Sequence, residues 1–257
     1  MKIAVVVRQV PDLIEPLEIA DSGAALDLDG ASFLVNESDD HALEQALLLK
    51  ESAGGTVVVV AFDWGDVDNT LYAAAAKGAD QIIKIPVDGD HPPVSRKAAA
   101  VYAQVVQNLG ADLVLIGCQA HDELEGALGP VLAMALGLPY VGVVRGVEAG
   151  EESSVRAFKE FPGAVKAQMS VRLPAVLGVL AADQPPRYVP VSRIRGAMKS
   201  TEFQEQAATP PADAEPAVTV ERMYHPEAAE RAEILSGSEE EVARRIAEIL
   251  VEKGVVK

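Results

Sequence analysis

Histidine, cysteine and neighbouring carboxylates are the residues with which this chain could carry out bond chemistry. His121 and Asp122 form the one neighbouring histidine–acid pair in a plausible site, and such a pair can transfer protons. More commonly, such neighbours are simply a solvated pair on a loop, with no chemical role. The motifs GxSxG, HExxH, Walker A and GxGxxG do not occur in the chain. The sequence therefore argues against bond-making catalysis by this chain alone.

Metal and thiol chemistry also find little support. The four histidines, His41, His91, His121 and His225, do not stand at the spacing of metal ligands. The single cysteine, Cys118, directly follows an apolar run, and no adjacent base would activate its thiol. We therefore interpret Cys118 as a small packed residue. One cysteine excludes an internal disulfide and any cysteine-based metal cluster.

Nucleotide binding is better supported, because three segments lie where predicted strands end and helices begin. They are residues 6–8, 36–39 and 117–130. In open parallel sheets, ligands bind beyond the carboxyl ends of the strands, and phosphate groups bind at helix N-termini. Gly126 and Gly129 would let the backbone come close to a phosphate as the last helix begins. An ordinary strand–loop–helix connection is the alternative, since every α/β protein contains such loops.

The elements that must position these segments alternate between two patterns in the first 140 residues. Apolar runs rich in valine and isoleucine predict buried parallel strands, and alanine- and leucine-rich segments with helical spacing predict helices between them. Strands are expected at 3–7, 56–62, 81–85 and 112–117, and helices at 40–50, 69–77, 95–109 and 125–136. This repetition predicts an α/β fold with a doubly wound parallel sheet.

The pattern changes after residue 140. Four strand-like runs follow without intervening helices, and they predict an antiparallel extension that continues the sheet or folds back on it. These runs are residues 140–147, 154–158, 167–172 and 175–180. The next segment, residues 183–190, contains three prolines within six residues, which forbids a central strand or a helix and predicts an exposed, stiff loop.

The C-terminal part is predicted to be a linker followed by one helix. Residues 204–216 are rich in alanine, proline and acids, so they offer little to bury. Ser238 to Glu241 form a capping-box pattern, and an apolar stripe follows at helical spacing: Val242, Ile246, Ile249 and Leu250. Such an arm could dock on its own domain or on a partner subunit. We therefore expect a nucleotide-binding α/β domain at 1–183, a partner-recognition loop region at 184–199, and a linker with a helical arm at 200–257.

Composition limits the possible partners. The chain has 22 basic and 39 acidic residues among 257, and its net charge is −17. Such a surface repels phosphate backbones and anionic membranes, and 4% aromatic residues are too few for a platform that stacks nucleic-acid bases. We expect no nucleic-acid partner and no membrane insertion. The apolar run at 3–7 is too short for a signal peptide or a membrane span, which predicts a first strand in a cytoplasmic protein.

Several separated stretches resemble one family in order and spacing. They are residues 2–12, with a strand, a basic residue and a Val-Pro-Asp turn; 36–46, with an asparagine turn into a helix; 73–80, ending in Lys-Gly-Ala-Asp; 111–122, which reads DLVLIG and then QA and D; and 173–188, with LPAV and PRY. Over about residues 1–199 the chain resembles the beta subunit of electron transfer flavoproteins, the EtfB/FixA family. The resemblance implies a fold similar to the adenine nucleotide alpha hydrolases.

The resemblance also implies a function in electron transfer. The implied partners are an alpha subunit that completes a heterodimer, a flavin-containing dehydrogenase as electron donor, and the ETF oxidoreductase or a similar acceptor, which is quinone-linked or of another kind. The implied redox cofactor is FAD, which the alpha subunit mainly holds and the beta subunit partly covers. The beta pocket would hold AMP, or a second FAD in electron-bifurcating members, and no metal is implied. The C-terminal arm would wrap the alpha subunit.

Carried over by position, the family's nucleotide pocket consists of four groups of residues. They are Val6; Asn36, Glu37, Ser38 and Asp39; Phe62; and Gly117, Cys118, Gln119, Ala120, His121, Asp122, Glu123, Leu124, Glu125, Gly126, Ala127 and Leu128. Val191, on a loop framed by prolines, stands where the family usually has the leucine that anchors the partner dehydrogenase.

The chain departs from the family pattern around this pocket. Glu37 replaces the usual proline, and residues 126–129 replace a polar run, which leaves backbone N–H groups to hold a phosphate. Phe62 and Trp64 stand among residues that are usually small, and their rings could shield or fill the pocket. Asp39 and the pair Gly129-Pro130 resemble the corresponding residues of the bifurcating members.

Two rivals from other classes stay open. A stand-alone nucleotide-binding stress or signalling protein would have a similar fold. A nucleotide-dependent ligase of the same fold class is the other, and the absence of a glycine-rich SGGxDS loop argues against it.

Overall fold

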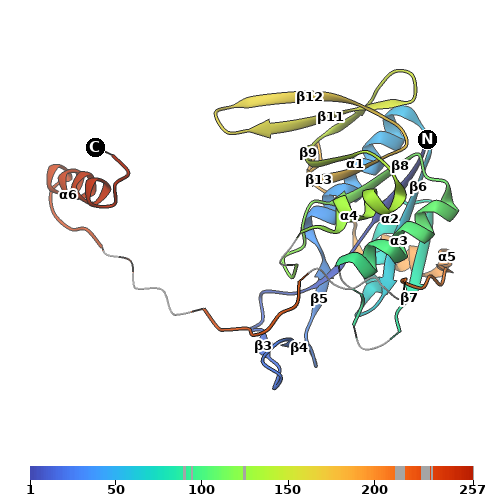
Figure 1. Cartoon of the computed structure of the whole chain (residues 1–257), viewed down its shortest axis with the longest axis horizontal. Coiled ribbons are helices and arrows are strands. Elements are labelled where there is room, and N and C mark those ends of the chain that lie inside the picture. The colour runs from blue at the N-terminus through green and yellow to red at the C-terminus, as the bar shows by residue number, and fades with distance from the viewer. Residues whose placement is uncertain are drawn as a thin grey trace. The chain divides into compact units, whose positions relative to one another are not determined.

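A computed structural model describes residues 1–88, 91–93, 95–123, 126–211, 218–226, 232 and 234–256 of the chain. The chain falls into two units, Met1–Arg222 and Met223–Lys257, and each is described by itself. Figure 1 shows that a sheet with helices on both of its faces forms the larger unit.

The centre of the larger unit is a seven-stranded sheet in the order β14-β7-β6-β1-β8-β13-β9. Its strands are β1 (Lys2–Val6), β6 (Thr56–Asp63), β7 (Gln81–Pro86), β8 (Leu113–Gly117), β9 (Tyr140–Arg145), β13 (Ala175–Ala181) and β14 (Gln204–Glu205). Every neighbouring pair runs parallel. The inner strands are continuous apolar runs, because both of their faces are covered. The predicted α/β fold with a doubly wound parallel sheet is confirmed.

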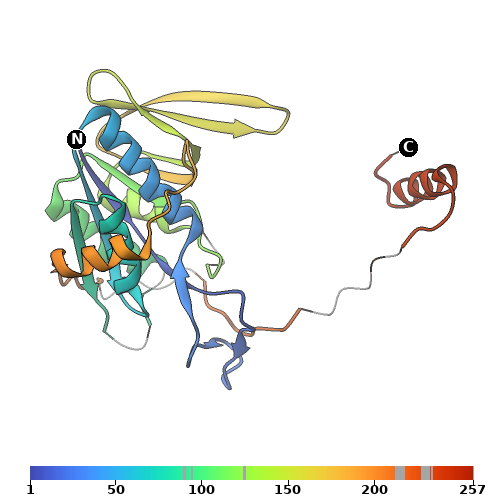
Figure 2. The same ribbon diagram turned by 180° about the vertical axis from the view of Figure 1, so that it is seen from behind.

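Four helices cover the two faces of the sheet (Figures 1 and 2). α1 (Glu37–Ala53) and α2 (Val67–Lys77) lie on one face, and α3 (Ser95–Leu109) and α4 (Leu128–Leu136) lie on the other. A glycine in the left-handed conformation, Gly137, ends α4.

The alternation of side chains along each strand divides the core into two layers. In β1, Ile3 and Val5 pack with α1 and α2, whereas Ala4 and Val6 pack with α3 and α4. All four of these side chains are fully buried. The valine- and isoleucine-rich strands therefore fill both layers with few aromatic rings.

The strand order reverses between β1 and β8. From β1 the chain passes through α1 to β6 on one side, and α3 later carries it to β8 on the other side of β1. The connections diverge there and open a crevice at the carboxyl ends of β1 and β8. Open α/β sheets bind their ligands at such a switch point.

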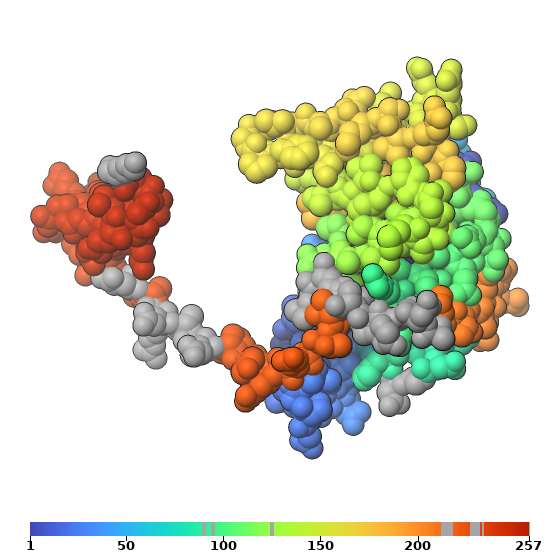
Figure 3. All heavy atoms as spheres, viewed as in Figure 1, coloured from blue at the N-terminus to red at the C-terminus, as the bar shows by residue number. Residues whose placement is uncertain are grey.

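Three antiparallel strands, β10 (Val147–Ala149), β11 (Ser154–Phe161) and β12 (Val165–Arg172), form a separate sheet. β11 and β12 make the long hairpin that projects from the body in Figures 1 and 3. The predicted antiparallel extension is therefore present, but β9 and β13, which the sequence placed in it, belong to the parallel sheet. α4 connects β8 to β9, and a helical crossover of this kind permits parallel pairing.

Two small antiparallel sheets, which the sequence did not predict, lie between β1 and α1 along the chain. One pairs β2 (Gln9–Pro11) with β5 (Phe33–Val35), and the other pairs β3 (Glu18–Ile19) with β4 (Leu26–Asp27). The first of them continues directly from the end of β1 and borders the crevice.

A helix stands where the sequence predicted a partner-recognition loop at 184–199. Residues 184–190 are irregular, and Pro190 then precedes α5 (Val191–Ser200), which packs on α2. The helix is possible because the prolines end at residue 190.

The expected linker also begins later than predicted. β14 extends the sheet at β7, and the ring centroid of Phe203 lies 4.5 Å from that of Tyr72 on α2. Gln104 Nε2 on α3 donates a hydrogen bond to the Thr209 carbonyl oxygen at 2.7 Å. Residues 200–209 therefore belong to the body of the larger unit, whereas residues 212–217 of the expected linker lie outside the described residues.

The smaller unit contains α6 (Glu239–Glu252), and its predicted capping box is confirmed. Ser238 Oγ accepts a hydrogen bond from the Glu241 N–H, and the Glu241 carboxylate accepts one from the Ser238 N–H at 2.8 Å. No residue of α6 is buried within the described structure, and Ile246 of the apolar stripe is 46% exposed. No described helix is both long enough and apolar enough to cross a membrane.

Candidate functional site

One buried carboxylate joins three elements at the switch point. Asp39, in the first turn of α1, has a fully buried side chain. Its Oδ1 accepts a hydrogen bond from the Gly117 N–H at 2.7 Å, and its Oδ2 accepts one from the Arg8 N–H at 3.0 Å. The Arg8 guanidinium adds bonds from Nε at 2.9 Å and from Nη2 at 3.0 Å. We call these four bonds the Asp39 clasp, because they hold α1 to the ends of β1 and β8.

The clasp requires a glycine at the end of β8. A Cβ atom on Gly117 would overlap Ser38 Oγ and Asp39 Oδ1 and would lie 2.7 Å from the Asp39 backbone nitrogen. Only glycine lets the start of α1 approach the strand this closely.

The loop after β8 is tied to the start of α1 and to β2. Ser38 Oγ donates a hydrogen bond to the Gln119 carbonyl oxygen at 2.8 Å, and Asn36 Nδ2 donates to the same oxygen at 3.1 Å. His121 Nε2 lies 2.9 Å from the Pro11 carbonyl oxygen. These bonds give the loop a defined position beside the crevice.

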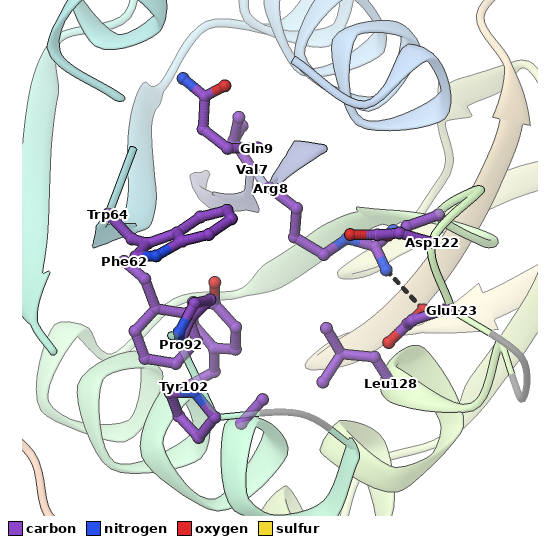
Figure 4. Close-up of a pocket in the computed structure, with 13 residues that line it drawn as sticks. Val7, Arg8, Gln9, Phe62, Trp64, Pro92, Tyr102, Asp122, Glu123 and Leu128 are labelled. Atoms are coloured by element: carbon purple, nitrogen blue, oxygen red, sulfur yellow. Dashed lines mark hydrogen bonds and ion pairs between the residues drawn. The ribbon is translucent and has the colours of Figure 1, made fainter. Parts of the chain in front are cut away.

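A cleft opens beside this loop, and Figure 4 shows the residues around it. Its apolar side contains Trp64, the only tryptophan of the chain, together with Phe62 and Tyr102, whose ring centroids lie 4.6 Å apart. Arg8 and Glu123 form a polar side across from these rings (Figure 4). The void, its open mouth included, is about 550 Å³. The remaining lining residues are Val7, Gln9, Pro92, Pro93, Ala98, Ala120, Asp122 and Leu128.

The polar side of the cleft is an ion pair that is largely out of water. Arg8 Nη1 donates to Glu123 Oε2 at 2.8 Å, and the two side chains are 11% and 17% exposed. Burial raises the pKa of the Glu123 carboxyl, although the Arg8 guanidinium opposes that shift. Burial likewise disfavours the Arg8 charge, but the attraction of Asp39 and Glu123 outweighs it and raises the pKa of the guanidinium. Arg8 is therefore a permanent cation that two acids already neutralise.

Tyr102 adds a buried hydroxyl to the apolar side. The residue is 1% exposed, and within the described structure its hydroxyl has no hydrogen-bond partner of good geometry, although the Phe62 backbone lies beside it. Burial raises the pKa of this phenol, so the hydroxyl stays protonated. A buried donor without a partner is a group that a bound molecule can satisfy.

The residues carried over from the family divide between the cleft and its supports. Those that line the cleft are Phe62, Ala120, Asp122, Glu123 and Leu128. Those that hold the loop and the clasp are Asn36, Ser38, Asp39, Gly117 and Gln119. Val6 is buried in the sheet beneath the cleft, Glu37 is exposed, and Cys118 is half-buried. Leu124 and Glu125 lie outside the described residues.

The two glycines expected to admit a phosphate have protein neighbours instead. A Cβ atom on Gly129 would lie 3.0 Å from Tyr140 Oη, so this glycine makes room for a tyrosine. Gly126 has a φ of +56°, and a Cβ atom built on it would lie 3.2 Å from Gln119 Cγ. α4 begins without a side-chain cap, and because Pro130 has no N–H group, Leu128 and Gly129 are the residues of its first turn whose backbone N–H groups could meet a ligand.

Sequence reasoning missed several lining residues. Arg8 lies in the segment 6–8 that the sequence proposed for nucleotide binding, and Trp64 was expected to shield or fill the pocket, although neither was among the residues carried over from the family. Tyr102 carried no signal, because an aromatic residue on the apolar face of a helix reads as core. The described residues contain no group of histidine, cysteine and carboxylate that could hold a metal ion.

The segment that leads to Val191 is held by the opposite side of α1. Three side chains of α1 accept hydrogen bonds from its backbone N–H groups: His41 from Ala182, Gln45 from Asp183, and Glu44 from Arg187.

An ion pair strengthens this attachment. The Arg187 guanidinium bonds to the buried Glu44 carboxylate at 2.7 Å and to Glu51 at 2.6 Å, and these bonds raise the pKa of the guanidinium. Tyr188 and Val191 follow with exposed fractions of 84% and 59%. The chain therefore presents two apolar side chains on a firmly held segment.

An open parallel α/β sheet with a cleft at its switch point is the architecture of the doubly wound class, whose members commonly bind nucleotides. Within that class, residues 26–215 match the model of the "Electron transfer flavoprotein domain". The chain therefore belongs to the electron transfer flavoprotein family.

Its relatives in this family bear the name of one subunit. The chain is 30% identical over 262 residues to "Electron transfer flavoprotein subunit beta" of Methylophilus methylotrophus, with 98% of each chain covered. It is 28% identical over 255 residues to the protein of the same name from Bacillus subtilis, with 97% of each chain covered. A third such protein, from Clostridium acetobutylicum, is 31% identical over 198 residues, which are 77% of this chain and 75% of the relative.

Proposed function

We propose that this chain is the beta subunit of a heterodimeric electron transfer flavoprotein of the cytoplasm. With an alpha subunit it carries electrons on FAD from a flavin-containing dehydrogenase to the ETF oxidoreductase or to another acceptor, quinone-linked or not. The observation that carries this proposal is the alignment with a protein named subunit beta over 98% of both chains. The chain itself makes and breaks no covalent bonds, and it supports the flavin that the alpha subunit mainly holds.

AMP is the proposed ligand of the cleft. Phe62 and Trp64 offer ring faces to a base, and the start of α4 offers the backbone N–H groups of Leu128 and Gly129 to a phosphate. The site fits the base better than the phosphate, because Arg8 is already paired and residues 126–129 bring no side-chain donors. AMP would have a structural role. The alternative, a second FAD in the same cleft, would supply a second redox centre when bound.

The test of the proposed function is the small-molecule content of the purified protein. The chain would be co-expressed with its partner, denatured gently, and the released molecules identified by mass spectrometry. We expect one FAD and one AMP for each heterodimer. Two FAD molecules would support the bifurcating alternative. A colourless monomer or homodimer that is stable without a companion chain would contradict the proposal and favour the stand-alone nucleotide-binding protein.

We also propose that the arm after Arg222 contributes to association with the alpha subunit. Truncation after Arg222 removes the smaller unit and leaves the larger one intact. We expect the dissociation constant of the heterodimer to rise about tenfold or more, because an apolar helix face would lose its partner. Association would be measured by calorimetry. Ile246→Glu, within the apolar stripe, should weaken association, whereas Arg244→Glu, outside it, should not. An equally tight heterodimer after truncation would show that the arm is not part of the interface.

A further inference from the structure

The Arg8 guanidinium is almost fully occupied before any ligand enters the cleft. Its Nε and Nη2 bond to Asp39, and Nη2 also bonds to the Gly117 carbonyl oxygen at 3.2 Å. These partners lie at the floor of the cleft and belong to the clasp. Only Nη1 is directed toward the cleft, and the dashed line in Figure 4 shows that Glu123 already holds it.

The charges around this point disfavour an incoming anion. Arg8 is the one cation among the described residues that line the cleft, and Asp122 and Glu123 line it as well. Asp39 adds a third carboxylate directly beneath. A phosphate would therefore meet one positive charge and three negative ones, whereas an uncharged base and ribose would meet chiefly aromatic and apolar side chains.

We propose that Glu123 occupies the position on Arg8 that a ligand phosphate would take, and thereby sets how strongly the cleft prefers a nucleotide over the corresponding nucleoside. This inference rests on the proposed adenine nucleotide in the cleft and names the residue that controls its phosphate. For a phosphate to bind Arg8, the Glu123 carboxylate must leave Nη1. A nucleoside needs no such exchange.

The Glu123 carboxylate is suited to such an exchange. Its side chain is 17% exposed, so it can turn to solvent, unlike the fully buried Asp39. Burial raises its pKa, which means that its charge is held in the cleft at a desolvation cost that Arg8 offsets only in part. When a phosphate takes over Arg8, that cost disappears as the carboxylate returns to water.

The test compares AMP with adenosine on the nucleotide-free heterodimer by isothermal titration calorimetry. Glu123→Gln keeps the shape of the side chain but removes its charge, so its bond to Arg8 becomes weaker. We expect AMP to bind about tenfold more tightly to this variant and adenosine to change less than about twofold. Glu160→Gln, on the projecting hairpin, removes the same charge far from the cleft and should change neither affinity.

Each result separates this inference from the proposal on which it rests. Unchanged AMP affinity, or an equal gain for AMP and adenosine, would overturn the role of Glu123 while leaving the nucleotide site in place. If neither AMP nor adenosine binds the wild type or the variant, the nucleotide site and the inference both fail. An equal gain in Glu160→Gln would show that net charge alone, rather than the position on Arg8, governs binding. Thermal unfolding of each variant would verify that the fold is retained.

Discussion

Replacing Asp39 by alanine is expected to lower the free energy of unfolding of the larger unit by about 3–5 kcal/mol. The substitution removes all four bonds of the clasp. The Gly117 N–H would then remain buried without its acceptor, and the buried Arg8 guanidinium would keep only Glu123 and the Gly117 carbonyl oxygen as partners, so a charge and a donor both lose the groups that offset their desolvation. The loss would be measured by urea denaturation, with the circular dichroism of the full-length chain as the signal.

The matched control is Glu37→Ala, two residues earlier in the same first turn. Glu37 is exposed, and its carboxylate gains only the favourable field of the helix N-terminus, so the loss should stay below about 1 kcal/mol. Asp39→Asn keeps the shape of the side chain and one acceptor oxygen. Its loss of unfolding free energy should therefore fall between the losses for Glu37→Ala and Asp39→Ala. Equal losses for Glu37→Ala and Asp39→Ala would mean that the clasp contributes nothing beyond the ordinary charge of a helix start.

Val191→Asp is expected to lower kcat/KM for reduction by the partner dehydrogenase about a hundredfold, roughly 2.7 kcal/mol. Val191 is 59% exposed at the first residue of α5, where we propose that the dehydrogenase docks. Its supporting segment is fixed to α1, so a small apolar side chain can bind there with little loss of conformational freedom. A carboxylate in the same contact would lose its water without gaining a partner. Stopped-flow reduction of the heterodimer's flavin would give the rate.

The control for this prediction is Val165→Asp on the projecting hairpin, where the valine is 57% exposed and has no proposed docking role. Both variants should retain the flavin content of the wild type. If the flavin of both variants is reduced at the wild-type rate, Val191 is not the docking residue. Flavin loss in Val191→Asp alone would show that the residue acts on the heterodimer rather than on docking.

The layers of the fold were predictable because their signals are local. Valine-rich runs such as residues 56–62 and the alanine-rich helices between them show their period within one turn or strand. The capping box at Ser238 is equally local, since it spans one helical turn. The parallel placement of β9 and β13 was not predictable in this way, because direction depends on which strand a run meets, and the intervening hairpin separates their sequences.

The site was predictable as a location but not as a set of contacts. The family resemblance and the ends of the strands pointed to the crevice where the structure has a cleft, and Phe62 and Glu123 line that cleft. The ion pairs of Arg8 were not foreseen, because they join residues 31 and 115 positions apart and neither partner stands out in its own segment. Tyr102 was hidden for the opposite reason, since its apolar surroundings give it the pattern of an ordinary core residue.

α1 serves two places at once, through Asp39 at its start and through Glu44 and Gln45 on the turns that follow. A helix is a stiff rod that rises about 1.5 Å per residue, so these anchor points keep a nearly constant separation. Engineers who wish to graft a foreign recognition segment onto this scaffold would therefore have to transplant the helix with it. The helix cannot be exchanged without also rebuilding the floor of the cleft. The cleft and the segment that leads to Val191 therefore cannot be altered independently of each other.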